Sequence, residues 1–271
     1  MVAGLFNNSI ISDLNAYKPA PVFIRPLQWL YCLYAFGLFI LLMLIIFPLV
    51  IVGALLGRVK GGNMVNDLCR YWGDVWLPMI GIFHRNIYEA PIEKGRQYVF
   101  VANHNCIMDI PVIFQGIRKK HFRILAKIEV SKVPVFGFLY RNATVMVDRS
   151  DAFKRAKSIV ELRAFMKEDI SVFIYPEGTY NETGKPLKSF YDGAFRLAIE
   201  TQAPVKPVVF LDTLKRMHYK SIWSLNPGKS RAVILPDISV EGLELKDISV
   251  LRDEAYKAME DCILRYANAQ Q

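Results

Sequence analysis

A histidine and an aspartate five residues apart, His104 and Asp109, are the first pair of residues that could carry out chemistry. They lie in the run Asn103–Asp109 (NHNCIMD), between an apolar β-branched stretch and a stretch with helical spacing. On one continuous helix the two side chains would lie about 140° apart, so only a turn at the strand–helix junction brings them together. Imidazole, with a reference pKa of ~6.5, can act as a base, and a carboxylate on its other nitrogen would fix the tautomer. The pattern predicts a general base and its partner, and a structural histidine is the alternative.

A second group of polar residues ends another predicted strand, in the run Phe173–Thr179 (FIYPEGT). Proline, glycine and a hydroxyl residue favour a tight loop, and loops at strand ends often carry ligand contacts in α/β proteins. Glu177 could accept a substrate hydroxyl or orient a base. An ordinary polar turn has the same composition and is the alternative.

Two further runs complete the set of candidates. Lys127, the run Pro134–Gly137 (PVFG) and the pair Asp148 and Arg149 follow one another along the chain. Arg149 ends a predicted strand and could bind a phosphate with its guanidinium fork, and a pair with a neighbouring aspartate is the alternative. The last run, Pro204–Val209 (PVKPVV), indicates a strand flanked by prolines.

The elements that must position these residues begin near Gln97, where short β-branched or aromatic runs alternate with helical stretches. The predicted strands are Tyr98–Ala102, Phe122–Ala126, Thr144–Val147, Ser171–Tyr175, Val205–Phe210 and Ala232–Leu235. The predicted helices are Asp109–Gly116, Asp151–Lys167, Tyr191–Thr201 and Val250–Tyr266. This alternation is typical of an α/β layer fold, in which the candidate residues follow strand ends.

The chain also contains a long uncharged segment between Arg25 and Arg58. As a helix, the apolar run Trp29–Leu56 would extend ~42 Å, against ~30 Å for the apolar core of a bilayer. We therefore expect membrane association, either as one tilted span or as two shorter embedded pieces. Pro48 could kink or break the helix. Two basic residues on each side give the positive-inside rule no preferred orientation.

The following stretch, Met64–Ile82, has apolar residues at helical spacing, and Pro78 should kink or end a helix there. This helix could lie in the membrane interface or pack on the rest of the protein. We expect a membrane-associated helical segment over residues 1–82 and an α/β domain over residues 83–271.

Composition narrows the classes of partner. The chain has 271 residues, 53% of them hydrophobic, and a net charge of +9, which excludes a disordered chain. The basic excess fits an anionic membrane or an acidic partner, and without a zinc-finger, basic-zipper or RNP signature we expect no nucleic acid. Neither the four cysteines nor the four histidines have metal-ligand spacing, so we expect no metal and no cofactor. The absence of a CxxC pair or disulfide framework favours a reducing compartment.

In this order, N-H-x4-D, P-x-F-G with a distal D-R, P-E-G-T and the proline-flanked strand resemble the glycerolipid acyltransferase family. More narrowly, the chain is similar to the 1-acylglycerol-3-phosphate acyltransferases of bacterial membranes. The resemblance covers Tyr98 to Phe210. It implies a mixed central sheet flanked by helices, and transfer of a fatty acyl group from a thioester of CoA or acyl carrier protein to a glycerolipid hydroxyl.

The resemblance also implies roles for single residues. His104 matches the general base of the family and Asp109 its partner, and Pro207 matches a block on the acyl-donor side. The matches to the acceptor-binding positions are Arg149, Glu177, Gly178, Thr179 and Lys127. Because a thioester is already activated, no covalent intermediate is required, and we do not expect Cys106 to be a nucleophile.

Two departures from the family pattern leave the acceptor headgroup open. Tyr180 stands where the third block commonly has arginine, so one phosphate contact is missing unless Lys185, Lys188 or Arg196 replaces it. The second block often has a glycine where this chain reads Arg141–Ala143 (RNA).

We therefore expect acylation of the sn-2 hydroxyl of 1-acylglycerol-3-phosphate, which forms phosphatidate in phospholipid synthesis. A lyso-aminolipid or another lysophospholipid is the alternative acceptor, and a non-catalytic membrane-anchored binding protein is the alternative of another class. The location of the donor and the free cysteines indicate a cell inner (plasma) membrane with the active site facing the cytoplasm. The basic cluster Arg118–Lys120 is the best local candidate for docking acidic acyl carrier protein.

Overall fold

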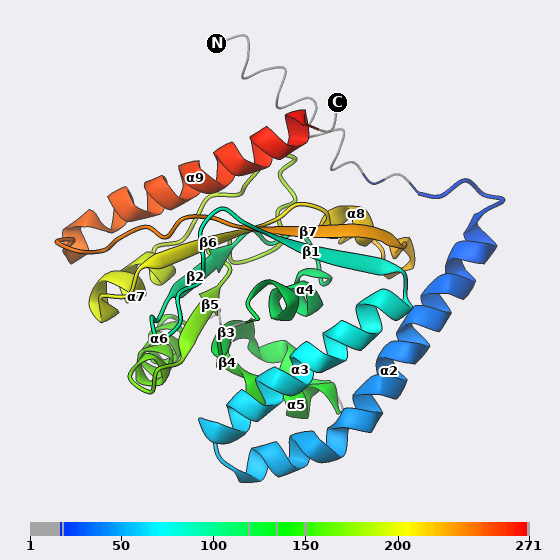
Figure 1. The fold of residues 1–271 in the computed structure, drawn as a ribbon, viewed down its shortest axis with the longest axis horizontal. Coiled ribbons are helices and arrows are strands. Elements are labelled where there is room, and N and C mark those ends of the chain that lie inside the picture. Colours follow the sequence, from blue (N-terminus) through cyan, green and yellow to red (C-terminus); the bar gives the residue numbers. More distant parts are fainter. Residues whose placement is uncertain (1–16, 18, 119, 134, 149–150, 270–271) are drawn as a thin grey trace.

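The computed structural model describes residues 17, 19–118, 120–133, 135–148 and 151–269. Within these residues a seven-stranded sheet in the order β1-β7-β6-β2-β5-β3-β4 forms the centre of the molecule (Figure 1). Its strands are β1 (Ile82–Tyr88), β2 (Val99–Ala102), β3 (Phe122–Lys127), β4 (Thr144–Val147), β5 (Ser171–Ile174), β6 (Val205–Phe210) and β7 (Gly228–Ile234). Neighbouring strands run parallel except β6 and β7, which are antiparallel. The sheet is therefore mixed, as the resemblance implied.

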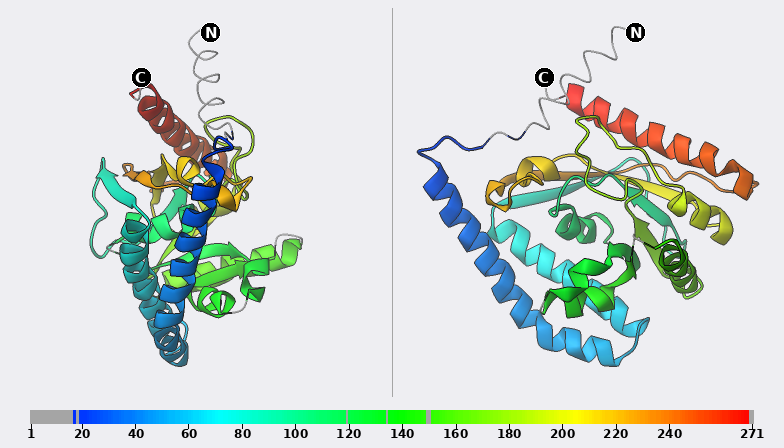
Figure 2. Two further views of the ribbon diagram at one scale, coloured as in Figure 1. Left: turned by 90° about the vertical axis from the view of Figure 1, so that its right-hand side faces the viewer. Right: turned by 180° about the vertical axis from the view of Figure 1, so that it is seen from behind.

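Helices cover both faces of this sheet (Figure 2). The α-helices are α2 (Arg25–Leu55), α3 (Lys60–Met79), α4 (Asp109–Gly116), α5 (Phe136–Ala143), α6 (Ala152–Met166), α7 (Gly193–Thr201), α8 (Thr213–Arg216) and α9 (Ile248–Asn268). The 3₁₀ turns are η1 (Ile128–Lys132), η2 (Ile222–Ser224) and η3 (Leu245–Asp247). The central strands are buried on both faces, which explains why their sequences are almost continuously apolar.

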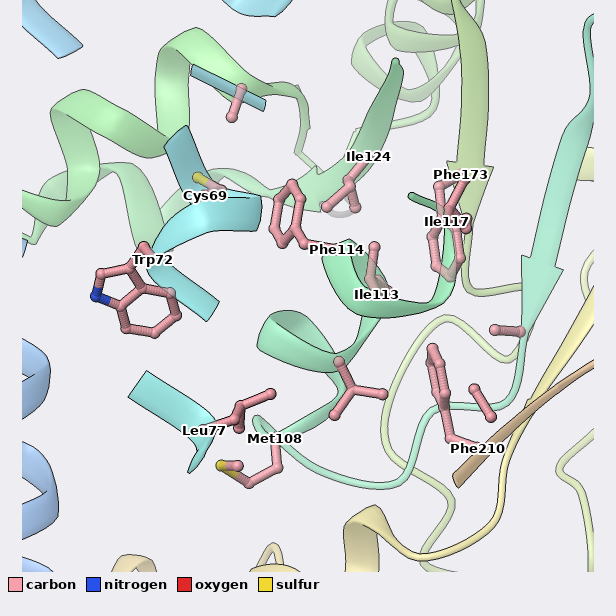
Figure 3. Close-up of a cluster of buried hydrophobic side chains, with 14 of the residues drawn as sticks. Cys69, Trp72, Leu77, Met108, Ile113, Phe114, Ile117, Ile124, Phe173 and Phe210 are labelled. Carbon is pink, nitrogen blue, oxygen red and sulfur yellow. The ribbon is translucent and has the colours of Figure 1, made fainter. Parts of the chain in front are cut away.

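Two apolar clusters follow from the alternation of side chains along the strands. Phe100 and Ala102 of β2 join one cluster with α2, α3, α4 and α5, whereas Val99 and Val101 join the other with α6, α7 and α9. Figure 3 shows the first cluster, in which Leu77 of α3 lies beside Met108. The loop that carries His104 is therefore packed directly on α3.

The helices α2 and α3 form an antiparallel hairpin. Glycines allow their backbones to touch near the turn, where a Cβ on Gly61 would lie 1.8 Å from the carbonyl oxygen of Gly53. Farther along, the indole of Trp76 donates to the carbonyl oxygen of Ala35 at 3.0 Å. α2 continues through Pro48, so a break at that residue was wrong. α3 ends one residue after Pro78 and packs on the domain with its apolar face.

α2 has the length and apolar composition to cross a membrane. Only 17% of its most apolar window is buried inside the protein. Large apolar side chains form an exposed stripe along its outer side: Leu27, Leu30, Leu41, Leu44, Ile45, Leu49, Val52 and Leu55. Such an uncovered stripe is far more apolar than the ordinary surface of a soluble protein.

A buried arginine ties the turn of this hairpin to the sheet. Arg123 of β3 is 1% exposed, and its guanidinium donates to the carbonyl oxygens of Arg58 and Val59 and to Oδ1 of Asn63, at 3.0 to 3.1 Å. These acceptors carry no charge, and burial lowers the pKa of Arg123 to about 10. The turn between α2 and α3 is thus held against the α/β domain.

Candidate active site

The candidate site lies at the carboxyl edge of the parallel strands. β2 lies between β5 and β6 and runs parallel to both, so the loops after these three strands emerge on one side of the sheet. The loop after β2 carries His104, and the loop after β5 carries Glu177. Parallel α/β sheets commonly place their ligand contacts at this edge.

His104 and Asp109 are brought together, as the sequence predicted. Nδ1 of His104 and Oδ2 of Asp109 are 2.8 Å apart. The same carboxylate oxygen accepts the backbone amides of Asn105 at 2.6 Å and Cys106 at 3.0 Å, because Asp109 is the first residue of α4 and closes the turn before it. Asp109 is fully buried, and the side chain of His104 is 14% exposed.

This geometry leaves the other ring nitrogen available. Among the residues that the structure describes, Nε2 of His104 has no hydrogen-bond partner. With the carboxylate on Nδ1, the neutral imidazole carries its proton on Nδ1 and presents the lone pair of Nε2. The arrangement suits a general base that accepts a proton from a substrate.

Two tyrosines enclose the imidazole. Tyr175 stacks on it with ring centroids 3.8 Å apart and an angle of 15°, and Tyr180 meets it edge-on at 4.5 Å and 69°. Burial raises the pKa of Tyr180 to about 12 and that of Tyr175 well above its ordinary value, so both phenols are neutral at physiological pH. Tyr175 therefore covers one face of the imidazole, and the two rings together restrict its orientation.

Glu177 binds the backbone of the site through both of its carboxylate oxygens. Its Oε1 accepts the amide of His104 and its Oε2 accepts the amide of Lys188, each at 2.8 Å. Burial raises the pKa of Glu177 to about 7, although these two amide hydrogen bonds and the charge of Lys188 oppose the shift. Of the two roles that the sequence left open, the contacts fit orientation of the base, since both oxygens are already engaged.

Gly178 and Thr179 form the turn beside Glu177. Gly178 has a φ of +74°, a backbone conformation that favours glycine, and a Cβ there would also lie 2.8 Å from the exposed ring of Tyr191. Thr179 is exposed, and its Oγ1 accepts a hydrogen bond from Nζ of Lys188 at 2.6 Å. Lys188 therefore lies at the open side of the site.

Two of the expected site residues, Lys127 and Pro207, are not brought into contact with His104 among the described contacts. Lys127 ends β3, is exposed and pairs with Glu129 at 3.4 Å. Pro207 pairs with Val101 inside the sheet and accepts the amide of Leu235 at 3.0 Å, so it lies within a strand and not at the edge. Arg149 lies outside the described residues. The roles of all three stay predictions.

A polar network to which the sequence analysis assigned no role anchors the loop that carries His104 to β6. The side-chain amide of Asn103 donates to the carbonyl oxygen of Phe210 at 3.0 Å and accepts its amide at 2.7 Å. Asn105 donates to Oγ1 of Thr213 at 3.0 Å. The two asparagines that flank His104 could have indicated this network, but their partners lie more than a hundred residues later in the chain.

Cys106 is buried beneath this loop. Its Sγ lies 3.4 Å from the carbonyl oxygen of Thr213, and burial raises the pKa of the thiol well above its ordinary value. A thiol in this setting is a weak nucleophile. In the described part of the chain, no cluster of three or more His, Cys, Asp or Glu side chains could hold a metal ion.

The basic cluster proposed for donor docking is partly neutralised. Arg118 forms a bidentate ion pair with Asp74 at 2.6 and 2.7 Å, and burial lowers the pKa of Lys120. Lys119 lies outside the described residues. Arg118 thus acts first as a link between α3 and the end of α4, which leaves little of its charge for a partner.

Comparisons with known sequences identify relatives of this chain. A family model described as Acyltransferase matches residues 84–211. The human 1-acyl-sn-glycerol-3-phosphate acyltransferase beta is 26% identical over 181 residues, which are 66% of this chain and 64% of that protein. The Caenorhabditis elegans putative 1-acyl-sn-glycerol-3-phosphate acyltransferase acl-2 is 30% identical over 182 residues, 66% of this chain and 63% of that protein. The match thus spans slightly less than two thirds of the length of these relatives.

A comparison with solved structures supports the fold. The crystal structure of the 1-acyl-sn-glycerophosphate (LPA) acyltransferase PlsC from Thermotoga maritima matches with a TM-score of 0.73 and 22% sequence identity. The match covers 89% of this chain and 97% of that chain. It extends well beyond residues 84–211, so part of the chain outside the family model shares this architecture as well.

Proposed function

The chain belongs to the glycerolipid acyltransferase family, and from this we propose that it acylates the sn-2 hydroxyl of 1-acylglycerol-3-phosphate to form phosphatidate. The acyl group comes from a thioester of CoA or acyl carrier protein. The observation that carries the proposal is the 2.8 Å contact between Nδ1 of His104 and Oδ2 of Asp109, with Nε2 left available. The names of the relatives supply the substrate class.

The proposed reaction is a direct transfer. Nε2 of His104 removes the proton of the acceptor hydroxyl as its oxygen attacks the thioester carbon, and the carbon–sulfur bond then breaks. The imidazolium returns its proton to the departing thiolate, which leaves as free CoA or carrier-protein thiol. Asp109 stabilises the imidazolium between these steps. Glu177 holds the backbone of His104 in place.

A second acceptor is favoured by one observation. Tyr180 contacts the imidazole and stands where the family commonly has an arginine that could bind a phosphate. The phenol of Tyr180 is neutral and offers no such charge. A lyso-aminolipid or another lysophospholipid would tolerate this environment. The non-catalytic binding protein remains the alternative of another class.

We propose further that α2 anchors the protein to a membrane. Both ends of the helix are tied to the α/β domain: Sγ of Cys32 donates to the carbonyl oxygen of Leu225 at 3.7 Å, and Arg58, just after the helix, pairs with Glu161 of α6. A helix held at both ends lies along the domain, so its apolar stripe can enter one face of the bilayer without projecting across it. Flotation with anionic liposomes tests the anchor, and a Leu44→Glu/Ile45→Glu variant that floats as well as the wild type would argue against it.

The location and the division of the chain are part of this proposal. The cell inner membrane with the site facing the cytoplasm follows from the location of thioester donors. A membrane-associated segment over residues 1–82 is supported by the hairpin, and the α/β acyltransferase domain over residues 83–271 by the sheet that begins with β1. Contacts between Phe39 of α2 and Phe136 of α5 suggest that the two parts fold as one unit.

The test is acyl transfer by purified protein in detergent micelles. Lysophosphatidate and a lyso-aminolipid are offered separately, each with acyl-carrier-protein and CoA thioesters. Phosphatidate formation that vanishes in a folded His104→Ala variant supports the main proposal and identifies the donor. Transfer to the aminolipid alone replaces the acceptor, and no transfer to any acceptor by folded protein favours the binding protein.

A further inference from the structure

A single buried carboxylate links Lys188 to the loop that carries His104. Glu177 is fully buried, and its two oxygens accept the amides of His104 and Lys188, each at 2.8 Å. Any rotation of this carboxylate would break one of the two bonds. Glu177 therefore fixes the backbone of both His104 and Lys188, and with it the position of Lys188 relative to the base.

The side chain of Lys188 is also held, but by a neutral group. Its Nζ donates to Oγ1 of Thr179 at 2.6 Å, and among the described residues it forms no salt bridge with a carboxylate. An ammonium group has three donors, so two remain for a ligand. A partly exposed cation that is positioned by a hydroxyl and not neutralised by an ion pair is suited to bind an anion.

We propose that Lys188 binds the phosphate of the acceptor and thereby selects an acidic lysolipid. This inference rests on the proposed acyl transfer. Thr179, which holds the ammonium, precedes Tyr180, whose ring lies 4.5 Å from that of His104. In lysophosphatidate only three bonds separate the carbon that bears the reacting hydroxyl from phosphorus, so a hydroxyl at Nε2 keeps the phosphate close to the residues around the base, and Thr179 and Lys188 adjoin them.

The alternative source of a phosphate, the CoA donor, fits this position less well. Its phosphates are separated from the thioester by the whole pantetheine arm, so they lie far from the base while the carbonyl reacts. The other two candidate cations are also less suitable. Arg196 pairs with Glu200 at 3.5 Å. Lys185 is exposed and enters the described hydrogen bonds of this loop only through its backbone.

The test compares Lys188→Met with Lys185→Met as the matched control. A charge-assisted contact to phosphate predicts a roughly ten- to hundredfold higher KM for lysophosphatidate in Lys188→Met. We expect little change in kcat, in the KM of the thioester or in the KM for 1-acylglycerol, which lacks the phosphate. Lys188→Arg should restore most of the affinity, and Lys185→Met should match the wild type.

The outcomes separate this inference from the proposed function. An unchanged KM for lysophosphatidate in Lys188→Met, or an equal loss for 1-acylglycerol, overturns the role of Lys188 and leaves acyl transfer standing. A rise in the KM of the CoA thioester alone also overturns it. A second arm measures binding of lysophosphatidate in a His104→Ala background with and without Lys188→Met. Weaker binding in the double variant supports the phosphate site even if the wild type transfers no acyl group, whereas equal binding refutes it.

Discussion

Replacement of Asp109 by asparagine tests whether the site depends on the negative charge of this residue or only on its hydrogen bonds. Oδ2 of Asp109 accepts three hydrogen bonds, from Nδ1 of His104 and from the amides of Asn105 and Cys106. In Asp109→Asn the amide oxygen must occupy that place, because the amide nitrogen there would face three donors. The loop and the imidazole tautomer are therefore retained, and the negative charge is lost.

The size of the effect follows from the distance. Two unit charges 2.8 Å apart interact by about 6 kcal/mol at an effective dielectric constant of ~20. The amide dipole and the lower desolvation cost of the neutral side chain recover part of this energy. We expect a loss of about 3 to 5 kcal/mol in transition-state stabilisation, which is a fall in kcat of roughly 10²- to 10⁴-fold.

The assay follows the release of free thiol at saturating donor and acceptor, together with thermal unfolding. Oδ1 of Asp109 has no hydrogen-bond partner among the described residues. The new NH₂ group in its place should therefore lower the free energy of unfolding by about 1 to 3 kcal/mol. Asp109→Leu, which removes all three hydrogen bonds, serves as the disruptive control. A folded Asp109→Asn enzyme with kcat within threefold of the wild type would refute the role of the carboxylate in stabilising the imidazolium.

Two further predictions concern the residues around the base. Cys106→Ala should keep most of the acyl-transfer activity, because the buried thiol has a raised pKa and lies against the Thr213 carbonyl; a folded but inactive variant would contradict direct transfer. Burial raises the pKa of Glu177 from 4.5 to about 7, so the folded protein binds this proton more tightly than the unfolded chain. Its contribution to the free energy of unfolding is fully present below pH ~4.5, decreases as the pH rises to about 7 and is lost above that. Denaturant unfolding from pH 5 to 8 should therefore show a shallower decline in Glu177→Gln than in the wild type, and equal slopes would be evidence against a raised pKa.

Much of the sheet could be predicted because its central strands are buried on both faces. β2, β5 and β6 are nearly continuous apolar runs, and each began and ended within one residue of its predicted bounds. β1 was missed because it is an edge strand with a mixed sequence (IFHRNIY) that gives no continuous apolar run. The short helix α5 was missed because it has only eight residues and follows Val135, whose φ is +62°.

The site shows the same division between local and distant information. His104 and Asp109 lie five residues apart, so one turn joins them and their spacing was sufficient to predict the pair. The stacking of Tyr175 on His104 depends on the parallel pairing of β2 with β5, about seventy residues later in the chain. No sequence pattern specified that Glu177 would bind two backbone amides. Lys127 and Pro207 were assigned by resemblance alone, and the described contacts give them no direct link to the base.

The hairpin and the active site are connected by packing and not only by the chain. Phe39 of α2 packs edge-on against Trp72 and Trp76 of α3, and the neighbouring Leu77 joins Met108 of the catalytic loop in one apolar cluster. At the other end, Arg123 fixes the hairpin turn to the sheet. A membrane bound to the outer stripe of α2 would therefore lie at a fixed distance from the catalytic loop. A lysolipid acceptor in that membrane would therefore meet the base from a surface whose position relative to His104 is set by this packing and not by a flexible linker.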